Sequence, residues 1–404
     1  MNNTIELFAG CGGLLEGFER SGFYKLLSGV EWEESPVNEL RSRLKSEYRM
    51  DDADQRLLQF DIQRTSDLIN GWKDDKYGCS AGMDKILGGT NVDVVVGGPP
   101  CQAYSVAGRV RDKNGMKNDY RNYLFESYLR IVDYYRPKAF LFENVPGILS
   151  AKPGNEGLPI IDRIRSAFDE ADYEVLTDLS EAIVDMTEYG IPQKRKRIII
   201  LGLNRRLYGN ACQKMLHDFY KVELPKHKEG IMTVRDAIGD LPKLFPLEEP
   251  IRWEKRKLSH SLPDPMINGH VSRFHSKRDI DVFRMLEEDI ESGRNEYISI
   301  DSLKQLYTDL TGRKSNIHKY HVIRWDEPSN LIPAHLYKDG LRHIHPDSSQ
   351  ARTITVREAA RLQTFPDSYI FHGSQSDSFK MIGNAVPPKF AEKAAIALNA
   401  VLGG

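Results

Sequence analysis

Short apolar runs alternate with longer amphipathic stretches through the first half of the chain. The runs, which are rich in β-branched residues, are IELF, LLSGVEW, VDVVVGG, KAFLFENV and RIIILGL. The stretch 122–135 between two of them has apolar residues at helical spacing, namely Leu124, Tyr128, Leu129 and Val132. Strands that are apolar throughout are typical of a sheet with both faces buried. The alternation therefore predicts an α/β protein with a doubly wound, mostly parallel sheet.

This alternation of apolar runs and amphipathic stretches ends after about Leu203. The stretch 204–349 is richer in proline, histidine and charge, and its helices are short; the pattern at 302–312 predicts one that ends at Gly312. We therefore expect a second, smaller domain at 205–375. The first domain, 1–204, would be completed by 376–404, whose tail KFAEKAAIALNAVL has the pattern of a helix.

Two helix starts are marked by local signals. Ser35 before Pro36 predicts an N-cap followed by the first helical residue. In RTITVREAARLQTFPD, Thr355 and Glu358 have the spacing of a capping box, and Pro366 follows the expected end of the helix. We interpret this last segment as structural.

Composition narrows the class of protein. The chain has 404 residues, of which 28% are charged and 40% hydrophobic, as in ordinary globular proteins. No apolar run approaches the roughly 18 residues of a membrane span, and the N-terminus lacks the pattern of a signal peptide. The four cysteines (Cys11, Cys79, Cys101 and Cys212) form no CxxC pair, so we expect no zinc site, no disulfide framework and a cytoplasmic protein.

The net charge of −2 hides an uneven distribution. From about Ile191 to Ile280, Lys and Arg outnumber Asp and Glu roughly two to one. Three basic runs lie there: QKRKR, the pair Arg205–Arg206, and WEKRK around Trp253. Such a segment favours a local surface for a polyanion, although a solvated surface is the commoner origin of any single run.

A glycine-rich turn follows the first apolar run. In FAGCGGLLEGF, Gly10, Gly12 and Gly13 would let a ligand approach the backbone at the carboxyl end of the sheet. About 20 residues on, the next strand ends at Glu31, the spacing at which a carboxylate binds ribose hydroxyls, and Trp32 beside it would stack on adenine. The turn is not GxGxxG and no P-loop lysine follows, which disfavours dinucleotide and nucleoside triphosphate sites.

A cysteine stands at the same expected edge. Cys101 follows VDVVVGG and two prolines, which end the strand and fix the direction of its sulfur, as a nucleophile requires. The next strand ends at Glu143, a plausible proton donor. Arg195 and Arg197 precede the following strand and would make the surroundings of a thiolate electropositive.

Taken together, FAGCGG, GPPCQ, ENV, QxRxR and GNAVPP stand in the order found in DNA cytosine-5 methyltransferases of the bacterial restriction–modification type, which this chain resembles from Ile5 to Pro388. The middle of the second domain is unmatched. The resemblance implies a Rossmann-like fold that uses S-adenosylmethionine, with a target-recognition domain as the smaller part. One departure is mild: Glu6 stands where the family often has Asp.

The resemblance also implies roles for individual residues. Cys101 would be the nucleophile, Glu143 would contact the ring nitrogen and amino group of cytosine, Arg197 would hold its carbonyl, and Arg195 would support the site or contact phosphate. Gln193 completes that motif. The expected cofactor-binding residues are Phe8, Gly10, Gly12, Gly13, Glu31, Trp32, Asp61, Ile62, Pro100, Asn384 and Val386.

The chemistry then implies partners. Carbon 5 of cytosine is unreachable in stacked DNA, so we expect a flipped base, covered by the segment 105–122 as a lid. The second domain would read double-stranded DNA in the major groove. No metal is needed. We expect a monomer in a prokaryotic cytoplasm, associated with the nucleoid, whose partner is an endonuclease acting on the same sequence.

Two alternatives stay open at this point. The first is an RNA cytosine-5 methyltransferase of the same fold, which the long stretch between QKRKR and RTITVREAAR disfavours. The second is a catalytically silent DNA-binding regulator, which the joint presence of Cys101, Glu143, Arg195 and Arg197 disfavours.

Overall fold

The structure is a computed structural model that describes residues 1–100, 124–152, 159–314, 319–338 and 340–403. It divides into two compact units. The first comprises 1–190, 195–230 and 385–404, and the second comprises 191–194 and 231–384. The first therefore includes 205–230, which we had expected in the smaller domain, whereas 376–384 lie in the second.

The first unit is built on one mixed sheet with the strand order β3-β2-β1-β6-β7-β10-β8, and β9 pairs with β10. The strands are β1 (Asn2–Leu7), β2 (Tyr24–Glu31), β3 (Leu57–Gln59), β6 (Val94–Gly97), β7 (Ala139–Asn144), β8 (Tyr173–Glu174), β9 (Ile183–Asp185) and β10 (Lys196–Asn204). The neighbours from β3 to β7 are parallel, whereas β10 is antiparallel to β7, β8 and β9. A small hairpin, β4 (Trp72–Asp74) and β5 (Gly78–Ser80), stands apart from this sheet.

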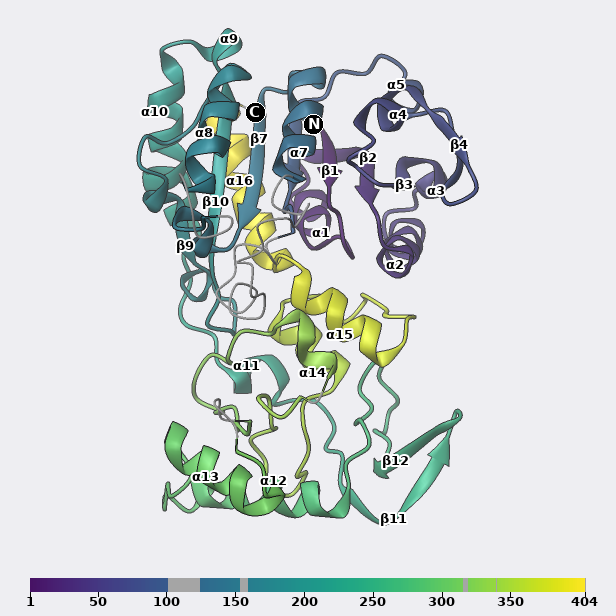
Figure 1. The fold of residues 1–404 in the computed structure, drawn as a ribbon, viewed down its shortest axis with the longest axis vertical. Helices are drawn as coiled ribbons and strands as arrows, with labels where there is room; N and C mark the ends of the chain where they lie inside the picture. The colour runs from purple at the N-terminus through teal and green to yellow at the C-terminus, as the bar shows by residue number, and fades with distance from the viewer. Residues whose placement is uncertain (101–123, 153–158, 315–318, 339, 404) are drawn as a thin grey trace. The chain divides into compact units, whose positions relative to one another are not determined.

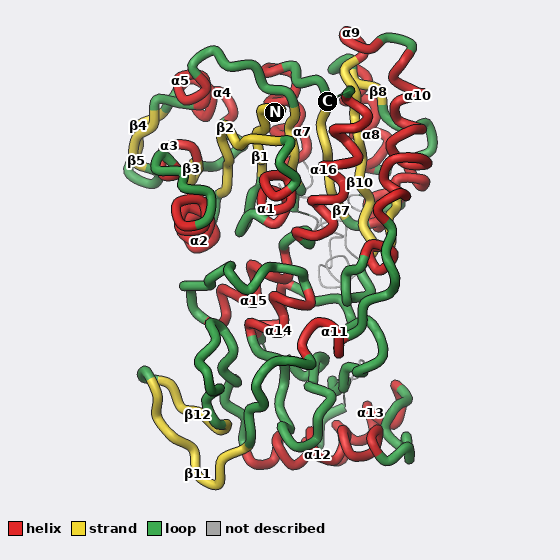
Figure 2. Tube along the Cα trace, turned by 180° about the vertical axis from the view of Figure 1, so that it is seen from behind, coloured by secondary structure: helices red, strands yellow, loops and turns green. Residues whose placement is uncertain are grey.

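Helices cover both faces of this sheet, which confirms the doubly wound α/β fold. They are α1 (Gly13–Arg20), α2 (Glu34–Ser46), α3 (Ala53–Arg56), α4 (Thr65–Asn70), α5 (Met83–Leu87), α7 (Leu124–Tyr135), α8 (Ile160–Glu170), α9 (Arg205–Tyr208), α10 (Ala211–Asp218) and α16 (Pro388–Leu402). Helices α7 and α8 lie in front of the sheet in Figure 1, and α16 lies in front in the reversed view of Figure 2. The strands β6 and β7 are fully buried apart from Glu143, as their apolar sequences predict.

The C-terminal helix α16 belongs to the first unit, as expected for the tail, and packs on α1 near the N-terminus. Gly17 on α1 allows this approach, because a Cβ there would lie 2.4 Å from that of Ala391. One helix start differs from its prediction. Helix α2 begins at Glu34 after the N-cap Glu33, so Ser35 lies inside the first turn.

The second unit contains α11 (Val234–Ile238), the hairpin β11 (Pro246–Trp253) and β12 (Arg256–His260), α12 (Lys277–Glu291), α13 (Ile300–Thr311), α14 (Val356–Leu362) and α15 (Gln375–Asn384). Helix α13 ends before Gly312, which has the left-handed conformation, as predicted. The capping box of Thr355 and Glu358 opens α14, also as predicted. Glu358 is buried and forms an ion pair with Arg352, 2.6 Å between Oε1 and Nη2, so this segment does hold its unit together.

Candidate active site

The glycine turn after β1 has an unusual backbone. Phe8, Gly10 and Gly12 have φ angles of 58°, 53° and 77°, in the left-handed region that favours glycine. A Cβ added at Gly10 would meet no atom of the described residues within 4 Å. Open space therefore lies against the backbone at the carboxyl end of β1, where ligands of such sheets bind.

Glu31, at the end of β2, holds this turn in place. Its Oε2 accepts a hydrogen bond from the Gly10 amide at 2.8 Å, and its Oε1 accepts from the amides of Trp32 and Glu33 at 2.8 Å each. Burial raises the pKa of Glu31, and these amides oppose that effect. A carboxylate has about four acceptor positions, of which the described residues fill three at Glu31, so one remains for a ligand hydroxyl.

The C-terminal segment reaches the same turn. A Cβ at Gly13 would lie 2.2 Å from the carbonyl oxygen of Val386, so glycine is needed there for the close approach of this segment. The structure thus brings Val386 to the turn. Asn384 is the exposed last residue of α15 and belongs to the second unit.

Three further expected cofactor residues lie near strand ends of the first unit. Asp61 and Ile62 follow β3; Ile62 is buried, and Oδ1 of Asp61 accepts a hydrogen bond from the Gln63 amide at 3.0 Å. Trp32 follows β2 with 49% of its surface exposed, and the Lys76 Nζ lies 5.9 Å from the centre of its ring. The Trp32 ring is therefore accessible to a planar group.

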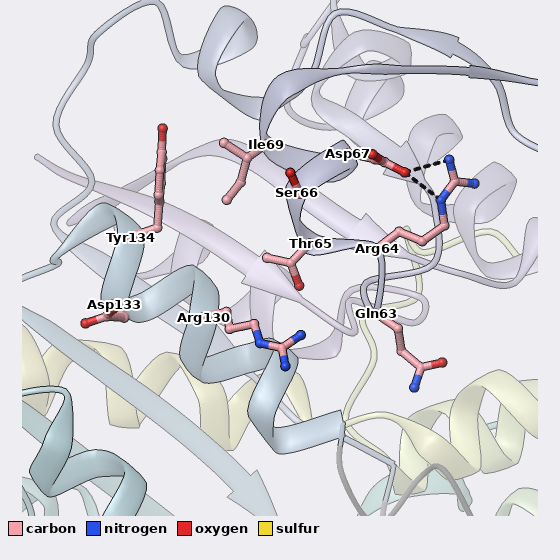
Figure 3. Close-up of a pocket in the computed structure, with 9 residues that line it drawn as sticks. All are labelled: Gln63, Arg64, Thr65, Ser66, Asp67, Ile69, Arg130, Asp133 and Tyr134. Atoms are coloured by element: carbon pink, nitrogen blue, oxygen red, sulfur yellow. Dashed lines mark hydrogen bonds and ion pairs between the residues drawn. The ribbon is translucent and has the colours of Figure 1, made fainter.

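Figure 3 shows a groove whose first lining residue, Gln63, directly follows Asp61 and Ile62 in the sequence. It is lined by residues of α4, the turn before it, and α7: Gln63, Arg64, Thr65, Ser66, Asp67, Ile69, Arg130, Asp133 and Tyr134. Arg64 is already paired with Asp67 on its rim. Of the expected site residues that the structure describes, none lines this groove.

Glu143 and Arg197 meet at the carboxyl edge of the sheet. Since β10 is antiparallel to β7, its beginning lies beside the end of β7, and Ile199 is opposite Glu143. The Arg197 Nε lies 2.9 Å from the Glu143 Oε1, and each side chain is only 12% exposed. The structure thus joins two of the residues expected to act on the base.

Arg195 has a different environment. It is 2% exposed, and its Nη2 donates a hydrogen bond to the carbonyl oxygen of Ala385 at 2.9 Å. This contact supports the C-terminal segment that reaches Gly13. Gln193 lies in the second unit, where its Nε2 donates to the Leu362 carbonyl at 3.0 Å and its Oε1 accepts from the Ile332 amide at 3.2 Å.

Two residues at this edge were missed by the sequence reasoning. A Cβ at Gly98 would lie 2.8 Å from the Glu143 Oε2, so glycine makes room for that carboxylate. The Asn144 Nδ2 donates a hydrogen bond at 3.2 Å to the carbonyl oxygen of Pro99, which leads through Pro100 to position 101. The second glycine of VDVVVGG and the asparagine of ENV were the available signals.

Cys101 and the expected lid, 105–122, lie outside the described residues. Of the other cysteines, Cys11 and Cys212 are buried and Cys79 is exposed. Burial raises the pKa of the Cys11 thiol, so this side chain stays protonated and packs as a small apolar group. Among the residues that the structure describes, no cluster of His, Cys, Asp or Glu has the arrangement of a metal site. The helices of this same part of the chain include none long and apolar enough to cross a membrane.

Comparison with known proteins decides the family. The model of the family "C-5 cytosine-specific DNA methylase" matches residues 2–400. The chain belongs to this family.

Relatives of this methylase support the assignment. This chain is 33% identical to type II methyltransferase M.Bpa9945I of Bacillus paralicheniformis, over 99% of both chains. It is 30% identical to M.AgeI of Thalassovita gelatinovora, over 95% of this chain and 96% of that one. Among solved structures, a prophage-encoded protein of E. coli has a TM-score of 0.66 at 24% identity, and S. pombe Dnmt2 has 0.57 at 14%; each match covers 100% of both chains and shows the fold.

A C-5 cytosine-specific DNA methylase transfers the methyl group of S-adenosylmethionine to carbon 5 of cytosine in DNA. The activity, enzyme class and methyl donor expected from the sequence are thus confirmed. The first unit fits this donor, because open space at Gly10 lies beside the carboxylate of Glu31, and the Trp32 ring is accessible.

Proposed function

We propose that this methylase acts through Cys101, with Glu143 and Arg197 as the residues that hold the cytosine. The observation that carries this proposal is the 2.9 Å ion pair of Glu143 and Arg197, at the sheet edge from which Pro99 and Pro100 lead to Cys101. The pair offers a carboxyl group and a guanidinium side by side. These groups match the ring nitrogen and amino group on one side of cytosine and its carbonyl on the other.

The thiolate of Cys101 would add to carbon 6 of the ring, and the electron density released makes carbon 5 nucleophilic. S-adenosylmethionine supplies an electrophilic methyl group on a positively charged sulfur. After carbon 5 has gained the methyl group, loss of its proton and departure of the Cys101 thiolate restore the aromatic ring. Glu143 and Arg197 would stabilise the charge that develops on the ring during the addition.

The cofactor site would be formed by the first unit. Glu31 would bind ribose hydroxyls, Trp32 would stack on adenine with Ile62 behind it, and Asp61 would accept from the adenine amino group. Phe8, Gly10, Gly12, Gly13 and Pro100 would border the methionine part, and Val386 would close the pocket. Arg195 would act as a positioning residue through Ala385.

The second unit would recognise the target sequence in double-stranded DNA, which this protein would bind as a monomer with the base flipped out. The names of M.Bpa9945I and M.AgeI as type II methyltransferases support a role in restriction–modification. The partner would then be an endonuclease that cuts the same sequence, in the cytoplasm of a prokaryote.

A methyl-transfer assay tests the proposed residues. The purified protein is incubated with S-adenosylmethionine carrying a tritiated methyl group and with unmethylated genomic DNA, or with total RNA. We expect label in DNA from the wild type and from the control Cys79→Ala, and none from Cys101→Ala. Label in RNA only, or an active Cys101→Ala variant, would refute the proposal.

A further inference from the structure

The three basic runs of the sequence differ in whether neighbouring carboxylates pair with their side chains. In the first, Lys194, Lys196 and Arg197 pair with carboxylates and Arg195 is buried. In the second, Arg205 pairs with Asp169 at 2.7 Å and Arg206 pairs with Asp172 at 2.5 Å. Apart from the buried Arg195, the basic side chains of these two runs are paired with neighbouring carboxylates.

The third run forms the tip of the hairpin β11–β12 in the second unit. Its three basic side chains, Lys255, Arg256 and Lys257, and the preceding Arg252 are all exposed. Within the described ranges of the chain, none of them forms an ion pair with a carboxylate. The Lys257 Nζ instead lies 4.8 Å from the centre of the exposed Phe274 ring. Within 252–257 only Glu254 is acidic, so the tip keeps a net positive charge.

The pairing of the two strands makes this charge unfavourable for the isolated protein. Arg252 is directly opposite Lys257, and Trp253 is opposite Arg256. Like charges directly opposite each other destabilise a ribbon, and a ribbon of only two strands has little stability to spare. The acidic Glu248 and Glu249 lie farther from the turn on β11, so the hairpin is polarised, with its positive end at the tip. A polyanion bound at the tip would relieve the repulsion.

The shape of the hairpin fits one such polyanion. Figures 1 and 2 both show it extending away from the helices of its own unit. Glu254 and Lys255 have φ angles of 43° and 63°, which close the two strands through a tight two-residue turn. A narrow two-stranded ribbon is one of the elements that the major groove of DNA admits.

We propose that the hairpin β11–β12 enters the major groove of double-stranded DNA, with Arg252 and Lys257 bound to backbone phosphates and Lys255 at the leading end. This inference rests on the proposed function only in taking DNA as the bound polymer. It assigns the DNA contact to one element of the second unit. Since the sequence-independent part of DNA binding comes from such phosphate contacts, it can be measured without knowledge of the target sequence.

The test is the salt dependence of DNA binding. The full chain and the variant Arg252→Gln/Lys257→Gln are titrated onto a fluorescent 40-base-pair duplex of mixed sequence in 50 to 200 mM KCl. Each lost phosphate contact lowers the slope of log affinity against log salt by about 1, so we expect the variant's slope to be smaller by about 2. Affinity should fall at every salt concentration, with a melting temperature no lower than that of the wild type, because the repulsion is removed, and with unchanged affinity for S-adenosylmethionine.

The control Arg313→Gln/Lys314→Gln removes the same charge from another exposed site of the second unit, just after α13. It should keep the wild-type slope. Equal slopes for all three proteins, an equal reduction in both variants, or no binding by the wild type would overturn the inference. Methyl transfer to genomic DNA is measured separately. If the wild type is active but the hairpin variant keeps the wild-type salt slope, this inference alone is refuted. If the wild type is inactive, the proposed function is refuted.

Discussion

The Nε of Arg197 lies 2.9 Å from the Oε1 of Glu143 because β10 runs antiparallel to β7. The first residues of β10 therefore lie at the edge where the parallel strands end. A parallel β10 would place Arg197 at the opposite edge, away from Glu143. The direction of this one strand thus assembles the two residues that we propose to hold the base.

The two residues should act as a unit. Glu143→Gln keeps the shape of the side chain but removes the charge, and Arg197→Lys keeps the charge but loses the planar fork. We expect each change to lower the rate of methyl transfer about 10²- to 10³-fold in single-turnover measurements, with unchanged affinity for S-adenosylmethionine. The double variant should be much less impaired than the product of the two effects; independent effects would contradict the coupling.

The variants Gly10→Ala and Gly13→Ala should lose different properties, the first affinity for S-adenosylmethionine and the second stability. A Cβ at Gly10 enters open space at the proposed cofactor site, so Gly10→Ala should weaken binding of S-adenosylmethionine at least tenfold and cost only about 1 kcal/mol of stability, for its positive φ. A Cβ at Gly13 meets the backbone of Val386, so Gly13→Ala should cost about 3 kcal/mol. Calorimetric titration and urea unfolding separate the two outcomes. Equal losses of stability would argue against this division of roles.

Glu287 on α12 should make stability depend on pH. It is 1% exposed, both its carboxylate oxygens lack a hydrogen-bond partner among the described residues, and burial raises its pKa to about 10. The charges of Arg352 and Arg284 oppose this shift, and those of Glu291 and Asp347 add to it. Between the ordinary value of 4.5 and about 10, the unfolded chain releases this proton and the folded chain keeps it. Stability from this group is therefore complete at low pH and is lost as pH rises.

The variant Glu287→Gln cannot ionise, so it should avoid this loss. We expect its melting temperature to exceed that of the wild type by several degrees at pH 8.5 and by little at pH 5.5. Thermal unfolding followed by circular dichroism at both pH values provides the measurement. A variant that is less stable than the wild type at pH 8.5 would show that Glu287 is ionised in the folded protein.

The sequence predicted the parts of this molecule that depend on local pattern. The apolar strands, the end of α13 at Gly312 and the capping box of Thr355 and Glu358 were all placed correctly. It did not predict the direction of β10, because an apolar run such as RIIILGL has the same pattern in either direction. It also misplaced the start of α2, because the Ser35–Pro36 signal is equally compatible with a first helical turn.

Contacts between distant segments were the least predictable. Nothing local to Gly13 indicates that its neighbour is the carbonyl of Val386 rather than a ligand, and nothing near Gly98 shows that it makes room for Glu143. The boundary between the two units was hard to predict for the same reason. Segment 205–230 has the composition of the second half but belongs to the first unit, where α10 contacts β10.

The central claim is that Cys101 carries methyl transfer to cytosine in DNA. Bisulfite sequencing of DNA from cells that express the wild type, Cys101→Ala or the control Cys79→Ala tests it most directly. We predict methylcytosine at one short recurring sequence with the wild type and the control, and none with Cys101→Ala. Methylation that persists in Cys101→Ala, or unmethylated DNA in cells that contain the folded wild type, would contradict the account.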